Sequence, residues 1–413
     1  MRFLLTCLSF TVLACSPALA ESWTEFRGPS GEGLASDSAK VPTNWSPGKN
    51  IRWKISVPGR AWSSPIAVDG RVFVTTAVET SKTELHLSLF CFNSESGKEI
   101  WNQRIFSVPP VRMHKKNSQA SPTPIFEDGR VYAHFGQYGT ACLDASDGKV
   151  IWKQTSLSYP PVHGNGGSPI IVGDHLIFSC DGKEDPFIVA LNKKDGSIAW
   201  KTGRGVETKR PFSFSTPMAI KVNGKTQVIS PASGAVISYN PDTGKEIWRF
   251  LYGEGYSVVP RPVFADGLIF VSSGFNRAVL YAIRPDGKGD VTKSHLAWKV
   301  EQGVPKESSF IVVDDLFYMN DDKGTLTCLD AKTGRQYYQE RLDGRGGYSA
   351  SPVYAGGNLF FHNGDGVTTV VRPGKRFRKI AENKIGEYGL SSFAVVDDGF
   401  IVRTEGHLQR IGK

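Results

Sequence analysis

The chain has 413 residues and a formal net charge of +9, with 44 glycines, 24 prolines and 9 tryptophans. Few segments show helical periodicity, so this composition favours an all-β protein over a helical one. After the N-terminal segment, no stretch approaches the roughly 20 apolar residues of a membrane helix, which excludes a transmembrane segment of that kind. The positive charge fits either a well-solvated surface or an anionic partner, depending on where it clusters.

The first 20 residues are predicted to be a secretory signal peptide. Arg2 is their only charge, residues 3–14 are apolar, and residues 18–20 (Ala-Leu-Ala) form a small-x-small cleavage site. An alternative is a lipoprotein, in which Cys15 becomes a lipid-anchored N-terminus. Either processing route predicts a periplasmic or extracellular protein, for which a nucleic-acid partner is not expected.

A short phrase recurs down the rest of the chain: an opening Ser-Pro-apolar triplet or a variant, an Asp-Gly turn, and Gly-Lys-x-x-Trp. The third residue of each opening falls at positions 66, 125, 170, 218, 263, 311, 353 and 394, in steps of 59, 45, 48, 45, 48, 42 and 41 residues. Such a period is typical of repeat architectures. Seven steps make eight units.

Each unit is predicted to form four short strands. In the second unit, strands at 123–126, 130–135, 140–144 and 150–154 are separated by a loop and by two Asp-Gly turns. Glycine tolerates the positive φ that a tight hairpin turn needs. Four strands in about 45 residues are typical of a propeller blade, so residues 50–413 are predicted to form an all-β, eight-bladed β-propeller with four-stranded antiparallel blades.

The two ends of the repeat region complement each other. The eighth unit has room for three strands only, at 392–396, 400–403 and 408–411, and lacks the strand that carries the tryptophan. Residues 51–55, which include Trp53, form such a strand ahead of the first unit. We therefore expect the N-terminal strand to complete the last blade and close the ring.

These repeats resemble the PQQ-like β-propeller family, most specifically in residues 148–152 (Gly-Lys-Val-Ile-Trp) and 244–248 (Gly-Lys-Glu-Ile-Trp). The resemblance implies that a set of tryptophans docks each blade on its neighbour through their large flat surfaces. The members of this set are Trp53, Trp101, Trp152, Trp200, Trp248 and Trp298. It also implies that residues 21–49 are the leader segment of an exported member and pack over the ring.

The family contains two kinds of relative with different chemistry. Quinoprotein dehydrogenases hold pyrroloquinoline quinone (PQQ) and Ca²⁺, whereas the propeller lipoprotein of the outer-membrane β-barrel assembly machine has no cofactor. The resemblance in length, and the absence of adjacent cysteines from the sequence, favour the second kind and no cofactor. PQQ with Ca²⁺ is the alternative, with Asn165, Glu307 and Asp365 as candidate oxygen ligands and Trp62 as the aromatic floor.

The loops that join successive blades supply a cation or an aromatic side chain almost everywhere. Since function often lies on loops held by a rigid scaffold, we expect these side chains to surround the mouth of a central channel. The candidate ligand-binding residues are Arg60, Trp62, Arg112, His114, His163, Asn165, Lys209, Arg210, Arg261, Lys306, Arg345 and Tyr348. Arginine suits carboxylate and phosphate groups, although plain solvation also explains polar loops.

This pattern predicts a binding or assembly module for an anionic small molecule, a glycan or a protein partner. The alternatives are a PQQ- and Ca²⁺-dependent oxidoreductase of alcohols or sugars, and a hydrolase or lyase of acidic glycans. The fold alone does not decide among them. The sequence assigns no catalytic residue and no metal-binding set.

A few other polar positions invite interpretation. Cys91, Cys142 and Cys328 occupy a small-residue position of the repeat and are expected to be structural, whereas Cys180 is expected in a loop as a free thiol. The acidic run at 181–185 is either a solvated turn or a source of a catalytic carboxylate.

Overall fold

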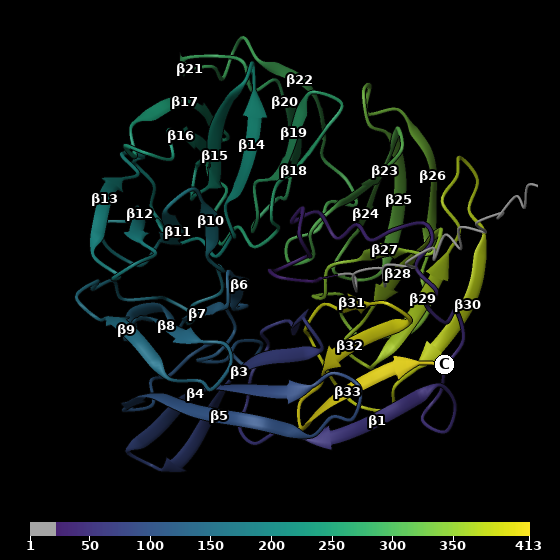
Figure 1. The fold of residues 1–413 in the computed structure, drawn as a ribbon. Coiled ribbons are helices and arrows are strands. Elements are labelled where there is room, and N and C mark those ends of the chain that lie inside the picture. Colours follow the sequence, from purple (N-terminus) through teal and green to yellow (C-terminus); the bar gives the residue numbers. More distant parts are fainter. Residues whose placement is uncertain (1–21) are drawn as a thin grey trace, which may run out of the picture.

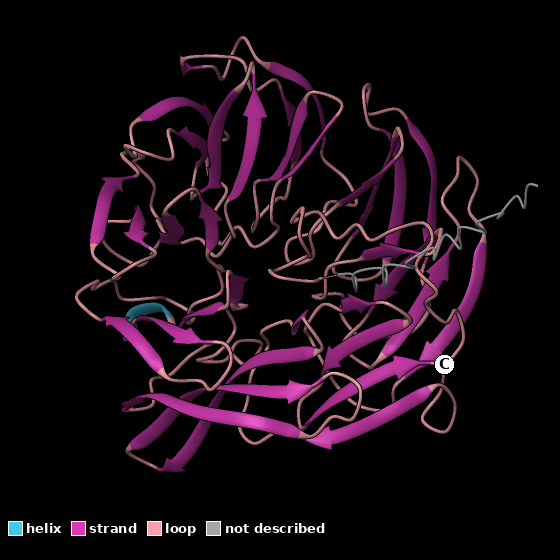
Figure 2. Ribbon diagram, in the orientation of Figure 1, coloured by secondary structure: helices cyan, strands magenta, loops and turns pink. Residues whose placement is uncertain are grey.

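The computed structural model describes residues 22–413 as a ring of eight antiparallel sheets (Figure 1). The predicted signal peptide and Cys15 lie outside the described residues. Within this range the only helical element is one 3-10 turn, η1 (Gly136–Tyr138), and the rest is strand and loop (Figure 2). The prediction of an all-β, eight-bladed propeller is therefore confirmed. Residues 22–413 contain no helix long and apolar enough to cross a membrane.

The first four blades follow the chain in order, each with its first strand innermost. Blade 1 contains β2 (Ile66–Val68), β3 (Arg71–Ser81), β4 (Glu84–Asn93) and β5 (Glu99–Val108). Blade 2 contains β6 (Ile125–Glu127), β7 (Arg130–His134), β8 (Thr140–Asp144) and β9 (Val150–Gln154). Blade 3 contains β10 (Ile170–Val172), β11 (His175–Cys180), β12 (Phe187–Asn192) and β13 (Ile198–Gly203). Blade 4 contains β14 (Met218–Val222), β15 (Lys225–Pro231), β16 (Ala235–Tyr239) and β17 (Glu246–Leu251), with β21 (Gly289–Asp290) added at its edge.

The last four blades complete the ring. Blade 5 contains β18 (Val263–Ala265), β19 (Leu268–Ser272), β20 (Leu280–Ile283) and β22 (Leu296–Val300). Blade 6 contains β23 (Ile311–Val313), β24 (Leu316–Asn320), β25 (Thr325–Asp330) and β26 (Gln336–Arg341). Blade 7 contains β27 (Val353–Ala355), β28 (Asn358–His362), β29 (Val367–Val371) and β30 (Lys379–Lys384). Blade 8 contains β31 (Ala394–Val396), β32 (Gly399–Arg403), β33 (His407–Gly412) and the N-terminal strand β1 (Ile51–Ser56).

The ring closes through its N-terminal strand, as the sequence predicts. β1 pairs antiparallel with β33, with Trp53 opposite Arg410 and Ile55 opposite Leu408, and Figure 1 shows the two strands side by side. The Trp53 indole N–H also donates a hydrogen bond to the Ser94 carbonyl of blade 1, at 3.0 Å. One strand thus belongs to the last blade and is bonded to the first.

The same indole contact recurs between other neighbouring blades. Trp101, Trp152, Trp200 and Trp298 donate to backbone carbonyls of the next blade at 2.8 to 3.2 Å. A glycine of the next blade lies against each ring; a Cβ on Gly148 would come within 2.6 Å of the Trp101 ring. Trp248 differs, because its N–H donates to Gln227 in its own blade at 3.0 Å.

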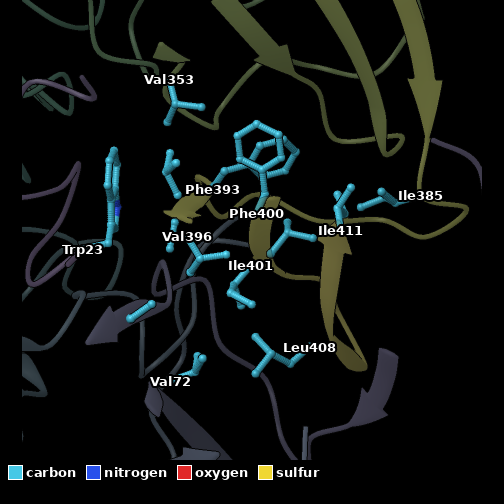
Figure 3. Close-up of a cluster of buried hydrophobic side chains, with 14 of the residues drawn as sticks. Trp23, Val72, Val353, Ile385, Phe393, Val396, Phe400, Ile401, Leu408 and Ile411 are labelled. Carbon is cyan, nitrogen blue, oxygen red and sulfur yellow. The ribbon is translucent and has the colours of Figure 1, made fainter. Parts of the chain in front are cut away.

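The leader, residues 22–49, lies across one face of the ring. Trp23 exchanges two backbone hydrogen bonds with Ala67 of β2, and the Ala35 N–H donates to the Tyr354 carbonyl of β27. Trp23 also joins the buried cluster of Figure 3, in which Phe393 and Phe400 are packed together. The leader therefore contacts blades 1 and 7, which lie on either side of blade 8.

Two expectations about polar residues are wrong. Cys180 ends strand β11 and is fully buried, because its side chain joins the core between blades 2 and 3. Asp181 does not lie in a solvated turn: it is buried, and both carboxylate oxygens accept hydrogen bonds from Arg204, at 2.7 and 2.8 Å. A buried carboxylate requires such a partner. Asp181 therefore has a structural role and is no longer a candidate catalytic residue.

Candidate ligand-binding site

A cavity of about 440 Å³ lies where the inner strands begin, at the centre of the ring. Seven of the residues that line it share one place in the repeat, the first residue of the opening phrase, and all carry a hydroxyl. They are Ser64, Thr123, Ser168, Thr216, Ser309, Ser351 and Ser392. We call this set the throat ring.

Backbone hydrogen bonds link the throat ring around the channel. The N–H of every opening residue except Thr216 donates to the hydroxyl oxygen of the opening residue in the next blade. The donor–acceptor pairs are Ser64–Thr123, Thr123–Ser168, Ser168–Thr216, Arg261–Ser309, Ser309–Ser351, Ser351–Ser392 and Ser392–Ser64, at 2.9 to 3.1 Å. The repeated Ser or Thr is thus the acceptor that joins one blade to the next at the axis.

Blade 5 breaks this pattern with Arg261, which stands where the other blades have a hydroxyl. Arg261 is 2 % exposed; its guanidinium forms an ion pair with Glu25 at 3.0 Å and donates to the Phe26 carbonyl at 2.5 Å. Phe26 itself lines the cavity, so the leader forms a floor there. The predicted place of Arg261 at the mouth is therefore wrong, because its side chain turns to the opposite end and holds the leader.

An ion pair crosses the other end of the cavity. The Lys116 ammonium lies 2.8 and 3.0 Å from the two carboxylate oxygens of Glu307, which also accepts a hydrogen bond from the Ser349 hydroxyl. Lys116 belongs to the connection between blades 1 and 2, and Glu307 to that between blades 5 and 6. These connections are half a turn apart in an eight-bladed ring, so the ion pair bridges the mouth.

Three further cations stand against aromatic rings that line the cavity. Each pair lies within the range of a cation–π contact, which holds the charge beside the ring. The pairs are Arg60 with Trp62 at 5.5 Å, Arg210 with Tyr256 at 4.6 Å, and Lys306 with Phe275 at 5.3 Å. We call these three cations the collar. Arg60 also donates a hydrogen bond to the Lys115 carbonyl, and Arg210 to the Tyr256 hydroxyl.

The two predicted histidines meet at the rim. His114 and His163 both line the cavity, with ring centroids 5.5 Å apart. Burial, and then the neighbouring His114, lower the pKa of His163. Within residues 22–413 no three His, Cys, Asp or Glu side chains come close enough together to hold a metal ion.

The remaining predicted residues lie outside the cavity lining. Arg112, Lys209 and Arg345 are exposed. Asn165 lies against Gly136 and accepts a hydrogen bond from Tyr159 at 3.3 Å. The expectation for Tyr348 is wrong, because its side chain is buried and its hydroxyl donates to the Asp343 carbonyl at 2.7 Å.

The candidate calcium ligands do not assemble into an oxygen-rich shell. The Glu307 carboxylate is already engaged by Lys116 and Ser349. Asn165 accepts its hydrogen bond from Tyr159, whereas Asp365 is exposed beside Gly346. Because Ca²⁺ takes six to eight oxygens at short range, these residues do not fit a quinone–calcium site.

Sequence reasoning missed the throat ring, although its signal was visible. Ser or Thr opens seven of the eight units, and the pattern was used only to count repeats. Sequence reasoning also missed Phe26, because the sequence of the leader does not indicate which of its residues lies in the channel. The bridge between Lys116 and Glu307 needs the ring geometry, since 191 residues separate the pair.

Comparisons with known proteins agree with this architecture. The family described as "Outer membrane protein assembly factor BamB" matches residues 86–294 and 290–375. A quinohemoprotein alcohol dehydrogenase, ADH-IIG of Pseudomonas putida, is 26% identical over 40% of this chain and 25% of its own length. The tetrathionate hydrolase of Acidithiobacillus ferrooxidans is 20% identical over 70% of this chain and 55% of its own length. The matches thus span about a quarter and about half of these relatives.

Solved structures show the same fold. The crystal structure of BamB from Moraxella catarrhalis superposes with a TM-score of 0.59 at 13% identity, covering 88% of this chain and 99% of that one. At this identity the likeness is one of fold.

Proposed function

The chain belongs to the family of PQQ-like β-propellers described by the outer membrane protein assembly factor BamB, and from this premise we propose that it is an exported binding module for an anionic partner. Its ligand-binding site is the cavity at the centre of the ring. The observation that carries the proposal is that this cavity has a floor formed by the leader at one end and a collar of cations at the other.

The charge distribution around the cavity supports the proposal that its ligand is an anion. Of the described residues that line it, Glu307 is the one acid, and Lys116 already neutralises it. The collar cations carry further positive charge beside the aromatic walls, which concentrates anions at a concave site. One relative is named for tetrathionate, an anion, and the family is named for an assembly factor. A small anion and the acidic segment of a protein both present the negatively charged group that this site would bind.

A charge-matched pair of triple variants tests the proposal. Replacing the collar by alanine (R60A, R210A and K306A together) should weaken binding of a fluorescent octa-aspartate peptide. About 0.5 to 1 kcal/mol for each of the three cations adds up to a loss of roughly 10- to 100-fold in affinity. An octa-asparagine peptide serves as the neutral probe, and binding is followed by fluorescence anisotropy at 20 and 150 mM NaCl.

The control triple removes the same charge elsewhere. Lys149, Lys194 and Lys245 are exposed lysines in the turns before the outer strands of blades 2, 3 and 4. Their replacement by alanine should leave the peptide affinity nearly unchanged at 150 mM NaCl, where distant exposed charges are screened. Equal losses in the two triples would mean that net charge, and not the cavity, binds the peptide.

A further inference from the structure

The hydroxyl oxygens of the throat ring all act as hydrogen-bond acceptors for backbone N–H groups. Each of the seven oxygens accepts an N–H from the neighbouring blade. Within residues 22–413 no acceptor is found for any of the seven hydroxyl hydrogens. A hydroxyl offers one donor hydrogen beside its lone pairs, so each ring member retains a donor for the occupant of the cavity.

Burial makes these donors significant. Every member of the throat ring is at most 5 % exposed, yet all seven line the cavity. A buried donor without an acceptor is destabilising, so seven of them around one axis form a throat rich in donors and poor in acceptors. A ligand group that presents several acceptor oxygens at once would satisfy them together.

A buried positive charge lies beside the throat. Arg27 follows the floor residue Phe26, is fully buried, and donates to the Phe310 carbonyl, next to Ser309 of the throat ring, at 2.5 Å. Its Nε and Nη1 atoms have no hydrogen-bond partner in the described part of the chain. Burial, and then the nearby Arg261, lower the pKa of Arg27 to about 9. The Glu32 carboxylate, also in the leader, offsets part of this charge, and an anion in the throat would offset more of it.

We propose that the throat ring binds the terminal XO₃ group of a tetrahedral oxyanion, as found in a sulfonate, a sulfate ester or a phosphate monoester. The inference rests on the proposed anion-binding function and adds the ligand class. A carboxylate has two oxygens in a plane, whereas an XO₃ group has three oxygens arranged around an axis and can accept from donors on every side of a ring. The cavity volume of about 440 Å³ leaves room for a small organic remainder.

The first test uses the unaltered protein and probes of matched chain length. Ethanesulfonate, ethyl phosphate and propionate are titrated by isothermal calorimetry at pH 7.5. We expect ethanesulfonate, ethyl phosphate or both to bind at least tenfold more tightly than propionate, and the tighter of the two identifies the source. Propionate binding as tightly as both would overturn the assignment of an XO₃ group.

The second test removes single hydroxyls. Thr216→Val keeps the shape of the side chain and should weaken the preferred XO₃ probe about tenfold, whereas Thr216→Ser should restore its affinity. Thr80→Val, on the exposed hairpin of blade 1, is the control that should not change it. Thermal unfolding checks that the variants are folded. If Thr216→Val does not fold, Ser309→Ala is used in its place.

The outcomes separate this inference from the proposed function. If the collar triple weakens the octa-aspartate peptide while Thr216→Val and Ser309→Ala leave the XO₃ probes unchanged, the mouth binds anions and the throat inference is wrong. If none of the anionic probes binds at low salt, both are wrong. Loss of XO₃ binding in Thr216→Val with recovery in Thr216→Ser supports the throat site.

Discussion

Replacing Glu307 by glutamine should tighten the binding of an anion in the cavity. Glu307 is the one acid among the described residues that line the cavity, and its side chain is only 15% exposed. It holds the Lys116 ammonium at 2.8 Å. An incoming anion therefore meets a negative charge and finds the nearest lysine already engaged. Glutamine keeps the size and removes the charge.

The magnitude follows from two contributions. A partly exposed ion pair is worth about 0.5 to 1 kcal/mol, which an anion no longer has to displace. Repulsion between Glu307 and a ligand charge at roughly 8 Å, with an effective dielectric constant of about 40, adds about 1 kcal/mol. Together, about 1.5 to 2 kcal/mol corresponds to roughly 10- to 30-fold tighter binding in E307Q. Lys116→Met should act in the opposite sense, because it leaves the Glu307 carboxylate facing the ligand unpaired.

Calorimetric titration of ethanesulfonate into the wild type, E307Q and K116M measures both effects. The gain in E307Q should shrink between 20 and 150 mM NaCl, since salt screens the repulsion. Glu340→Gln, an exposed site on the outer strand of blade 6, makes the same change in net charge and should not alter affinity. Unchanged or weaker binding in E307Q would refute the idea that the ion pair competes with the ligand.

Two predictions concern stability, measured by urea unfolding. Gly148 and Gly129 have similar positive φ angles, +76° and +73°, but only Gly148 faces Trp101. G129A should cost about 1 kcal/mol from backbone strain, and G148A at least 1 kcal/mol more; equal costs would argue against the indole contact. Burial lowers the pKa of His134 to about 3 and that of His362 to about 4, against about 6.5 unfolded. The unfolded chain therefore binds protons first as pH falls, so stability should drop by about 2 kcal/mol per histidine between pH 7.5 and 5. His362→Gln should remove its share of that slope, and an unchanged slope would contradict the assignment.

The number of blades and the closure of the ring could be predicted because both depend on local patterns. Asp-Gly turns, apolar alternation and the spare strand around Trp53 are short-range signals that need no knowledge of side-chain direction. The pairing of β1 with β33 then follows by counting, since one end lacks the strand that the other end has in excess.

The site was predicted less well because a loop assignment does not say where a side chain points. Arg261 and Tyr348 lie in blade connections as expected, yet one turns to the floor and the other into the core. Asp181 and Arg204 directly follow strands β11 and β13 of blade 3, and the folding of that blade brings them together although 23 residues separate them. Such directions depend on packing between blades, which periodicity alone does not encode.

The departure of blade 5 from the repeat explains how a symmetric ring acquires a closed pocket. Eight identical units would surround an open channel with eight equivalent hydroxyls. Arg261 removes one hydroxyl and instead binds Glu25 and the Phe26 carbonyl, so the place that interrupts the throat ring is the place that holds the floor. The leader also brings Arg27 and Glu32, which interact electrostatically with each other, so the floor holds two acidic and two basic side chains. Closure of the channel is thus a consequence of one substitution in the repeat.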